Sequence, residues 1–165
     1  MPQIDYVAKD LKIKYKSIFD LSELYKLLYR WFELHGYDFQ ELEYRESLEA
    51  TGKNLEIRWY AEKKMDDYIK FVIKPTFLVI GLSKVEIEHE GEKELTTKGE
   101  VEIRFDAYLI KDYNDKWKGP FLRFLRTCFD NFLIKSRIEG YEGQLHEELY
   151  NLMSEAKAFL NLHRF

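Results

Sequence analysis

One segment in the middle of the chain is apolar at consecutive positions. Phe71, Val72 and Ile73 follow one another, and residues 77–82 contain no polar side chain. A strand with one solvated face alternates apolar and polar residues, whereas a strand covered on both faces is apolar throughout. The pattern therefore predicts that a helix, a partner subunit or a ligand covers the second face of this strand.

The rest of the first two thirds mostly alternates, as strands of an antiparallel meander do. We expect strands over residues 4–15, 39–48, 55–62, 68–89 and 101–109, with turns at 51–54, 66–67 and 90–93. The alternation reverses at Lys9-Asp10, which predicts a bulge or bend. The segment 68–89 is long for one strand, so Pro75 or Gly81 is expected to break or bend it.

Three helices complete the pattern. The first follows a cap at Asp20 or Ser22 and ends at Gly36. The second starts at Pro120 and carries a broad apolar stripe between Phe121 and Leu133, and the third covers 145–160 after two glycines, Gly140 and Gly143. We expect one α+β domain, residues 1–165, with an antiparallel meander sheet of about five to six strands, one N-terminal and two C-terminal helices packed on it.

This order of elements is similar to the helix-grip fold of the START and pollen-allergen-like lipid-binding proteins, which curl a sheet around a long C-terminal helix. The resemblance covers most of the chain in element order but no sequence motif, and the glycine-rich loop of the plant branch is absent. It implies an alternative function: a carrier or enzyme for an apolar small molecule, held between the sheet and the helix 121–133.

The composition indicates the class of protein and the compartment in which we expect it. Aromatic residues make up 16% of the 165 residues and charged residues 34%, with many Lys and Glu but three Gln and five Asn, a balance typical of thermophile proteins. The first ten residues show no secretory signal, and no apolar run approaches the roughly 20 residues of a membrane helix. We expect a cytoplasmic protein without membrane contact.

No catalytic motif is present, and we expect neither a metal nor another cofactor. The sequence starting at His146 begins like a zinc-protease helix, but Tyr150 stands where the second histidine would be. Glu86, Glu88 and Glu90 alternate along one strand face and are expected to face water. A nucleophile elbow and a phosphate-binding loop are both absent from the sequence, so binding is favoured over catalysis.

Basic residues concentrate between Lys111 and Arg137, where seven of them stand against three acids, a net of +4 in a chain of net −4. The candidate patch is Lys116, Lys118, Arg123 and Arg126. Such a patch suits an acidic partner surface or a phosphate, and RNA or ribosome association follows as a weaker alternative. The alternative without a binding role is that these basic residues lie on a solvated helix face and pair with neighbouring acids.

The function expected from these observations is a non-enzymatic cytoplasmic binding protein, oligomeric, that acts through contacts with itself or another protein. Its anchors are expected among the doubly apolar strand residues. These are Phe77 and Val79 on one face, or Leu78 and Ile80 on the other.

Overall fold

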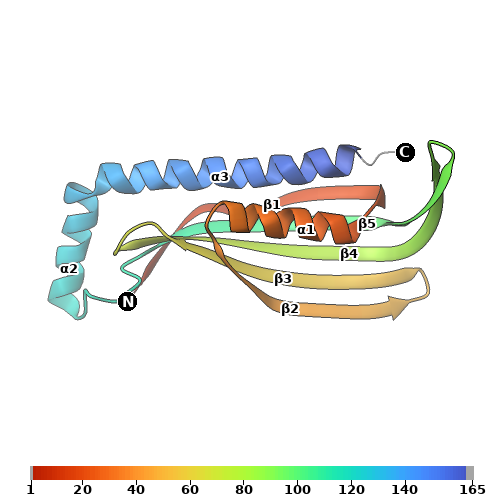
Figure 1. Cartoon of the computed structure of the whole chain (residues 1–165). Helices are drawn as coiled ribbons and strands as arrows, with labels where there is room; N and C mark the ends of the chain where they lie inside the picture. Colours follow the sequence, from red (N-terminus) through yellow and green to blue (C-terminus); the bar gives the residue numbers. More distant parts are fainter. Residues whose placement is uncertain (1, 163–165) are drawn as a thin grey trace.

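The structure, a computed structural model, describes residues 2–162. Its elements are β1 (Gln3–Phe19), α1 (Leu21–Leu34), β2 (Asp38–Glu49), β3 (Gly52–Lys64), β4 (Ile69–His89), β5 (Glu92–Lys111), α2 (Pro120–Cys128), a π-helical turn η1 (Phe129–Leu133) and α3 (Lys135–Leu162). All strand pairs are antiparallel, in the order β1-β5-β4-β3-β2 (Figure 1). The predicted α+β class, with one N-terminal and two C-terminal helices, is confirmed.

Strand β1 bends where its alternation reverses. Asp10 takes a left-handed conformation, with φ of 54°, and the register against β5 shifts on both sides of Ala8. The backbone N–H of Asp10 donates to the Asp106 carboxylate at 2.8 Å, which holds the bulge against β5. The predicted bend at Lys9-Asp10 is therefore confirmed.

Strand β4 is continuous through Pro75, so of the two positions expected to break or bend it, Pro75 and Gly81, only Gly81 does so. Pro75 pairs with Phe105 of β5 in register, whereas the β3–β4 ladder passes from Thr76 to Ile73 and skips Pro75 and Lys74. A proline has no N–H to donate, and the pairing on either side of it keeps the strand continuous. Gly81 is where the strand bends: its φ is 64°, and the β4–β5 register shifts between Ile80 and Ser83. The bulge redirects the strand, as single inserted residues do.

Beyond this bend, β4 and β5 continue as a two-stranded arm, residues 85–96. The last β1 partner on β5 is Thr97 and the last β3 partner on β4 is Leu82, so within the described chain the arm pairs only with itself. Glu90 and Gly91 close it with positive φ values of 52° and 83°, which suit a tight hairpin. Figure 1 shows the arm at one end of the molecule and α2 at the other.

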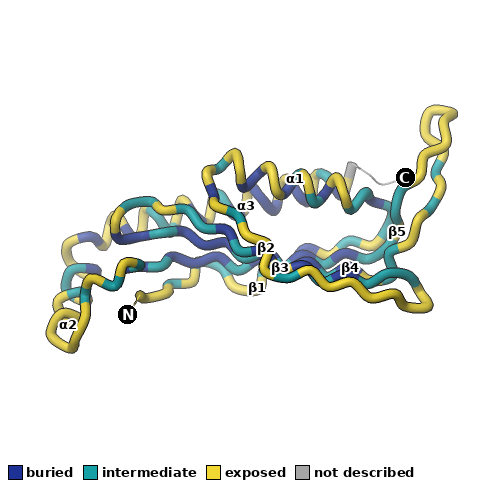
Figure 2. Tube along the Cα trace, turned by 60° about the horizontal axis from the view of Figure 1, so that its bottom comes forward, coloured by how far each residue is buried: buried dark blue, intermediate teal, exposed yellow. Residues whose placement is uncertain are grey.

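The core lies between one face of the sheet and the helices α1 and α3. The largest fully buried side chains of the sheet on this face include Trp59, Phe71, Phe77 and Phe105. Tyr25 and Phe32 of α1 pack edge-on against the indole of Trp59, and Tyr141 of α3 packs against Phe71. Figure 2 shows buried residues along the sides of the strands and helices that face one another.

The opposite face of the sheet carries no helix of the described chain. Val72 is buried there beneath longer neighbours, among them Glu62, whose carboxylate lies 2.8 Å from the Lys70 amine. Further along, Arg58 Nη2 lies 2.7 Å from Glu56 and Arg58 Nε lies 3.3 Å from Glu43. Ion pairs along β3 and between neighbouring strands thus lie over part of this face, while Ile80 remains 55% exposed, which shows how a doubly apolar strand fits a sheet with one helical layer.

The two C-terminal helices differ in their packing. Helix α3 lies along the sheet and is unbroken, so the interruption expected at Gly140 and Gly143 was wrong. Both glycines are exposed, while Ile138 and Leu145 on the inner side are buried, and this burial outweighs the roughly 1 kcal/mol each glycine costs a helix. Helix α2 instead runs across the end of the molecule, beyond the sheet (Figure 1).

No helix within residues 2–162 is both long enough and apolar enough to cross a membrane.

Candidate interaction surface

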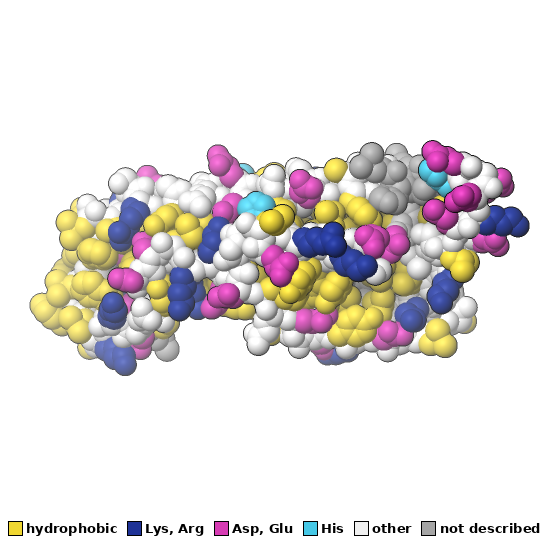
Figure 3. Space-filling view, viewed as in Figure 1, with side chains coloured by type: hydrophobic (Ala, Val, Ile, Leu, Met, Phe, Trp, Pro, Cys, Tyr) yellow, Lys and Arg dark blue, Asp and Glu magenta, His cyan; other side chains and the backbone are white. Residues whose placement is uncertain are grey.

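The α2–η1 segment exposes its apolar side chains instead of burying them. Phe121, Phe124 and Phe132 are 70%, 64% and 81% exposed, and α2 has no buried residue. Leu125 and Leu133 extend the same surface. We call these five residues the apolar end surface; Figure 3 shows hydrophobic side chains gathered at this end of the molecule. The apolar stripe expected to pack on the sheet therefore faces solvent.

One polar side chain of α2, that of Arg126, faces inward, whereas Arg123 is exposed. The side chain of Arg126 is 12% exposed, and its Nη1 atom lies 3.6 Å from Oδ2 of Asp112, which is 1% exposed. The Asp112 carboxylate also accepts backbone N–H groups from Lys116 at 2.8 Å and Trp117 at 3.2 Å. A buried charge needs a charged or hydrogen-bonding partner, so this contact fixes the rotation of α2 about its axis.

A second buried ionic cluster holds η1. The Lys111 amine lies 2.8 Å from Asp5 Oδ2 and 3.3 Å from Asp130 Oδ2. The Tyr68 hydroxyl donates to the other oxygen of Asp130 at 2.5 Å. Burial, followed by this bond to a carboxylate, raises the pKa of Tyr68 well above its usual range, so the phenol stays protonated and remains a donor.

Aromatic contacts complete this base. The ring of Phe129 lies 5.6 Å from the ring of Tyr68 and 5.6 Å from that of Trp117. In the β3–β4 turn, the Asp66 carboxylate accepts the N–H groups of Tyr68 and Ile69 at 2.8 and 2.7 Å. The apolar end surface is thus displayed on a packed, hydrogen-bonded support.

The expected basic patch is only partly assembled. Lys116, Lys118 and Arg123 are exposed at the end of the molecule, but Arg126 is turned inward to Asp112. Asp112 and Asp130 are buried against Arg126 and Lys111, which leaves Lys116, Lys118 and Arg123 exposed in this part of the described chain against one partly exposed acid, Asp115, 3.9 Å from Lys118. No sequence pattern marks Arg126 as structural, since its spacing from Arg123 suits a shared solvent face equally well.

The four strand residues expected as anchors divide between the two faces. Phe77 and Val79 are 2% and 1% exposed and belong to the core under the helices. Leu78 is half-buried and Ile80 is 55% exposed on the other face. A surface hollow of about 390 Å³ touches both of them and is rimmed by charged side chains, among them Arg45 and Glu46. Their part in an interface stays a prediction.

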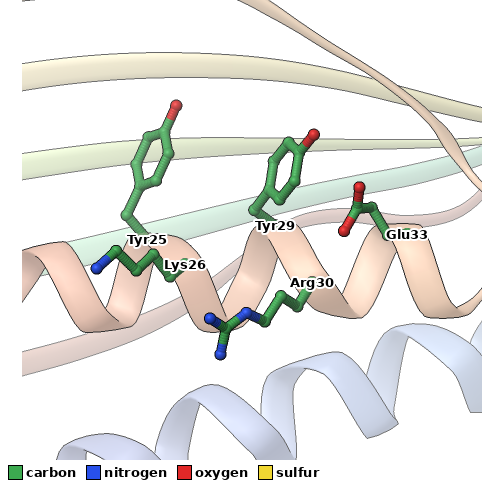
Figure 4. Close-up of a pocket in the computed structure, with 5 residues that line it drawn as sticks. All are labelled: Tyr25, Lys26, Tyr29, Arg30 and Glu33. Atoms are coloured by element: carbon green, nitrogen blue, oxygen red, sulfur yellow. The ribbon is translucent and has the colours of Figure 1, made fainter.

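Another surface hollow is lined entirely by α1. Figure 4 shows Tyr25, Tyr29 and Glu33 on one side of the helix and Arg30 pointing away from the two phenols. The Tyr25 hydroxyl donates to Glu41 at 3.2 Å, and burial together with this carboxylate raises the pKa of Tyr25 to about 12. The Tyr25 phenol therefore stays protonated and serves as a hydrogen-bond donor to the Glu41 carboxylate.

Within residues 2–162, no three His, Cys, Asp or Glu side chains lie together as a metal site requires. No protein-family model, curated protein or solved structure matches the chain.

Proposed function

We propose that this protein is a non-enzymatic binding protein that acts through protein–protein contacts, and that its partner covers the apolar end surface. The observation that carries the proposal is the orientation of α2. Two buried ionic contacts, Arg126 with Asp112 and Lys111 with Asp130, support a segment whose phenylalanines face water. Contiguous exposed apolar patches with a polar rim are typical of interaction sites.

The size of the surface supports this assignment. At roughly 200 Å² per fully exposed ring, the three phenylalanines Phe121, Phe124 and Phe132 leave about 400 Å² of apolar area in water. That is about half of what one partner buries in an interface of standard size, roughly 800 Å². Covering it removes about 10 kcal/mol of unfavourable hydration, at roughly 25 cal/mol per Å², before the costs of association.

The alternatives have less support. A carrier requires a cavity between the sheet and a C-terminal helix, whereas the α3 side chains facing the sheet, such as Leu145, Leu149 and Leu152, are fully buried in the core. Helix α2, which was to close that cavity, lies beyond the sheet. For RNA, the inward turn of Arg126 removes one of the four basic candidates from the surface.

Site-specific photo-crosslinking tests the proposal. A benzoylphenylalanine at position 124, and in a second variant at 121, is irradiated in cells that natively express the protein. We expect discrete protein adducts from both positions. The matched control carries the same residue at Leu34, which is 84% exposed but lies at the end of α1. Adducts to lipid only, or a pattern no different from that of the control, would contradict a protein partner.

A further inference from the structure

The chain itself carries a surface that complements the apolar end surface. We infer that the partner is a second copy of this chain, which contributes its β4–β5 arm, residues 85–96, to the α2–η1 segment of its neighbour. This inference rests on the proposed function and adds the identity of the partner. Three observations carry it: the charge of the arm, the charge around the apolar end surface, and the position of the two at opposite ends of the molecule.

The arm is acidic and extends free of the sheet. It contains five glutamates against one lysine, a net charge of −4 with its histidine neutral. Glu86 pairs directly with Leu95, and Glu88 lies two residues along the same face, opposite Lys93, whose amine lies 3.9 Å from Glu86. On this face Leu95, which is 78% exposed, stands beside two carboxylates and one amine. An isolated two-stranded hairpin is marginally stable in water, so docking would also stabilise it.

The apolar end surface offers the converse arrangement. Its phenylalanines are bordered by exposed Lys118 and Arg123, while the nearby acids Asp112 and Asp130 are buried in ionic contacts. The one partly exposed acid of the same loop, Asp115, lies 3.9 Å from Lys118 and offsets part of this positive charge. Leu95 would pack on the rings of Phe121 and Phe124 as the arm glutamates approach the basic rim. Complementary charge of this kind selects the partner and its orientation more than it adds affinity.

The same charges disfavour a symmetric contact. Two α2 helices packed about a two-fold axis would bring the basic rims of both copies together, and two arms would bring glutamates together. A contact between the unlike ends avoids both repulsions. Because Figure 1 shows these ends at opposite extremes of the long axis, the contact is head-to-tail, and it builds an open chain or a closed ring.

Sedimentation with two single-end variants tests the inference. The end variant, Phe121→Ser/Phe124→Ser, has lost the apolar rings but keeps its arm. The arm variant, Glu86→Lys/Glu88→Lys, has a basic arm but keeps the end surface. Leu34→Ser and Glu147→Lys/Glu155→Lys are matched controls at exposed positions elsewhere. Circular dichroism and thermal melts establish that each variant keeps its fold.

At about 100 μM, within the range where weak protein contacts are measurable, wild type and both controls should sediment above twice the 20.0 kDa protomer mass. Each single-end variant alone should be a monomer. Their equimolar mixture should form a 1:1 dimer and nothing larger, because the unchanged arm of the end variant can bind the unchanged end surface of the arm variant.

Three results would overturn the inference. If wild type stays monomeric under these conditions, the partner is not a second copy of this chain. Crosslinks to another protein would then still support the proposed function. An arm variant that dimerises by itself points to a symmetric contact through α2. A third result is that wild type and the arm variant bind anionic vesicles equally well while neither self-associates. That result would assign the apolar end surface to a lipid membrane. A Leu95→Ser variant checks the arm without changing its charge and should also be monomeric.

Discussion

Nη1 of Arg126 lies 3.6 Å from Oδ2 of Asp112, and this contact decides which side of α2 faces water. By sequence pattern the phenylalanine side would face inward, because burial of aromatic rings is strongly favourable. The burial of Asp112 creates a stronger local requirement, since a carboxylate away from water needs a cation and hydrogen-bond donors. Arg126 supplies the cation, and the apolar side of the helix is left outside.

Removing the charge of Asp112 should loosen α2. We expect Asp112→Asn to lower the free energy of unfolding by about 2–4 kcal/mol, because the Arg126 guanidinium then loses its buried counter-charge. Urea titration measures the loss, and hydrogen exchange should locate faster exchange in α2. The matched control is Asp115→Asn in the same loop: both aspartates have positive φ, which Asn tolerates, but the carboxylate of Asp115 lies 3.9 Å from the exposed Lys118. Equal effects of the two substitutions would contradict the assigned role of Asp112.

Alanine at Gly140 or Gly143 should stabilise the protein. Both positions are exposed in the middle of α3, and an added Cβ would meet nothing within 4 Å. Each substitution is expected to add about 0.5–1 kcal/mol, through helix propensity and a less flexible unfolded chain. Gly52→Ala is the opposite case, because φ there is 131° and a Cβ would lie 2.8 Å from the Gly81 backbone. Thermal melts should move in opposite directions, and a lower melting temperature for either α3 variant would sink this argument.

Stability should fall above pH 10 in part through Tyr37. Burial and then the hydrogen bond from its hydroxyl to Glu148, at 2.5 Å, raise the pKa of Tyr37 far above its usual range. Below pH 10 the phenol is protonated in both states; above it the unfolded chain loses this proton first, so unfolding becomes easier. The slope attributable to one such proton is about 1.4 kcal/mol per pH unit.

Urea titrations between pH 9 and 11.5 measure this effect. The Tyr37→Phe variant should be less stable at pH 8, because Glu148 loses a donor, yet decline less steeply than wild type above pH 10. Glu148→Gln keeps the buried ring and should retain part of the slope, because burial is the larger cause. Parallel curves for wild type and Tyr37→Phe would show that Tyr37 does not contribute.

Substitutions in β4 should separate core from surface. Phe77→Ala is expected to cost about 3–5 kcal/mol, because a ring 2% exposed leaves a cavity between the sheet and the helices. Ile80→Asp, on the exposed face, should change stability by less than about 1 kcal/mol. Denaturation measures both. If the apolar end surface is the interface, Ile80→Asp should also leave the sedimentation of the protein unchanged. If Ile80→Asp instead dissociates the assembly, the interface lies on the open face of the sheet.

Local patterns in the sequence were enough to find most elements. The alternation in the strands, the reversal at Asp10 and the stop at Gly36 depend on a few neighbouring residues, and each appears in the structure where the pattern put it. The interruption expected at Gly140 and Gly143 is not there, because one glycine costs a helix about 1 kcal/mol, which the packing of a long helix readily offsets.

The sequence alone was enough to find the α+β class and most of the residues that the strands, α1 and α3 bury, because periodicity follows from backbone geometry. It also located the basic cluster and the apolar stripe of α2. The side of α2 that faces water does not follow from that stripe. That orientation depends on Asp112 and Asp130, which meet Arg126, Lys111 and Tyr68 only after the sheet has brought the ends of its strands together. A pattern along one helix carries no information about a buried charge that a distant loop presents to it.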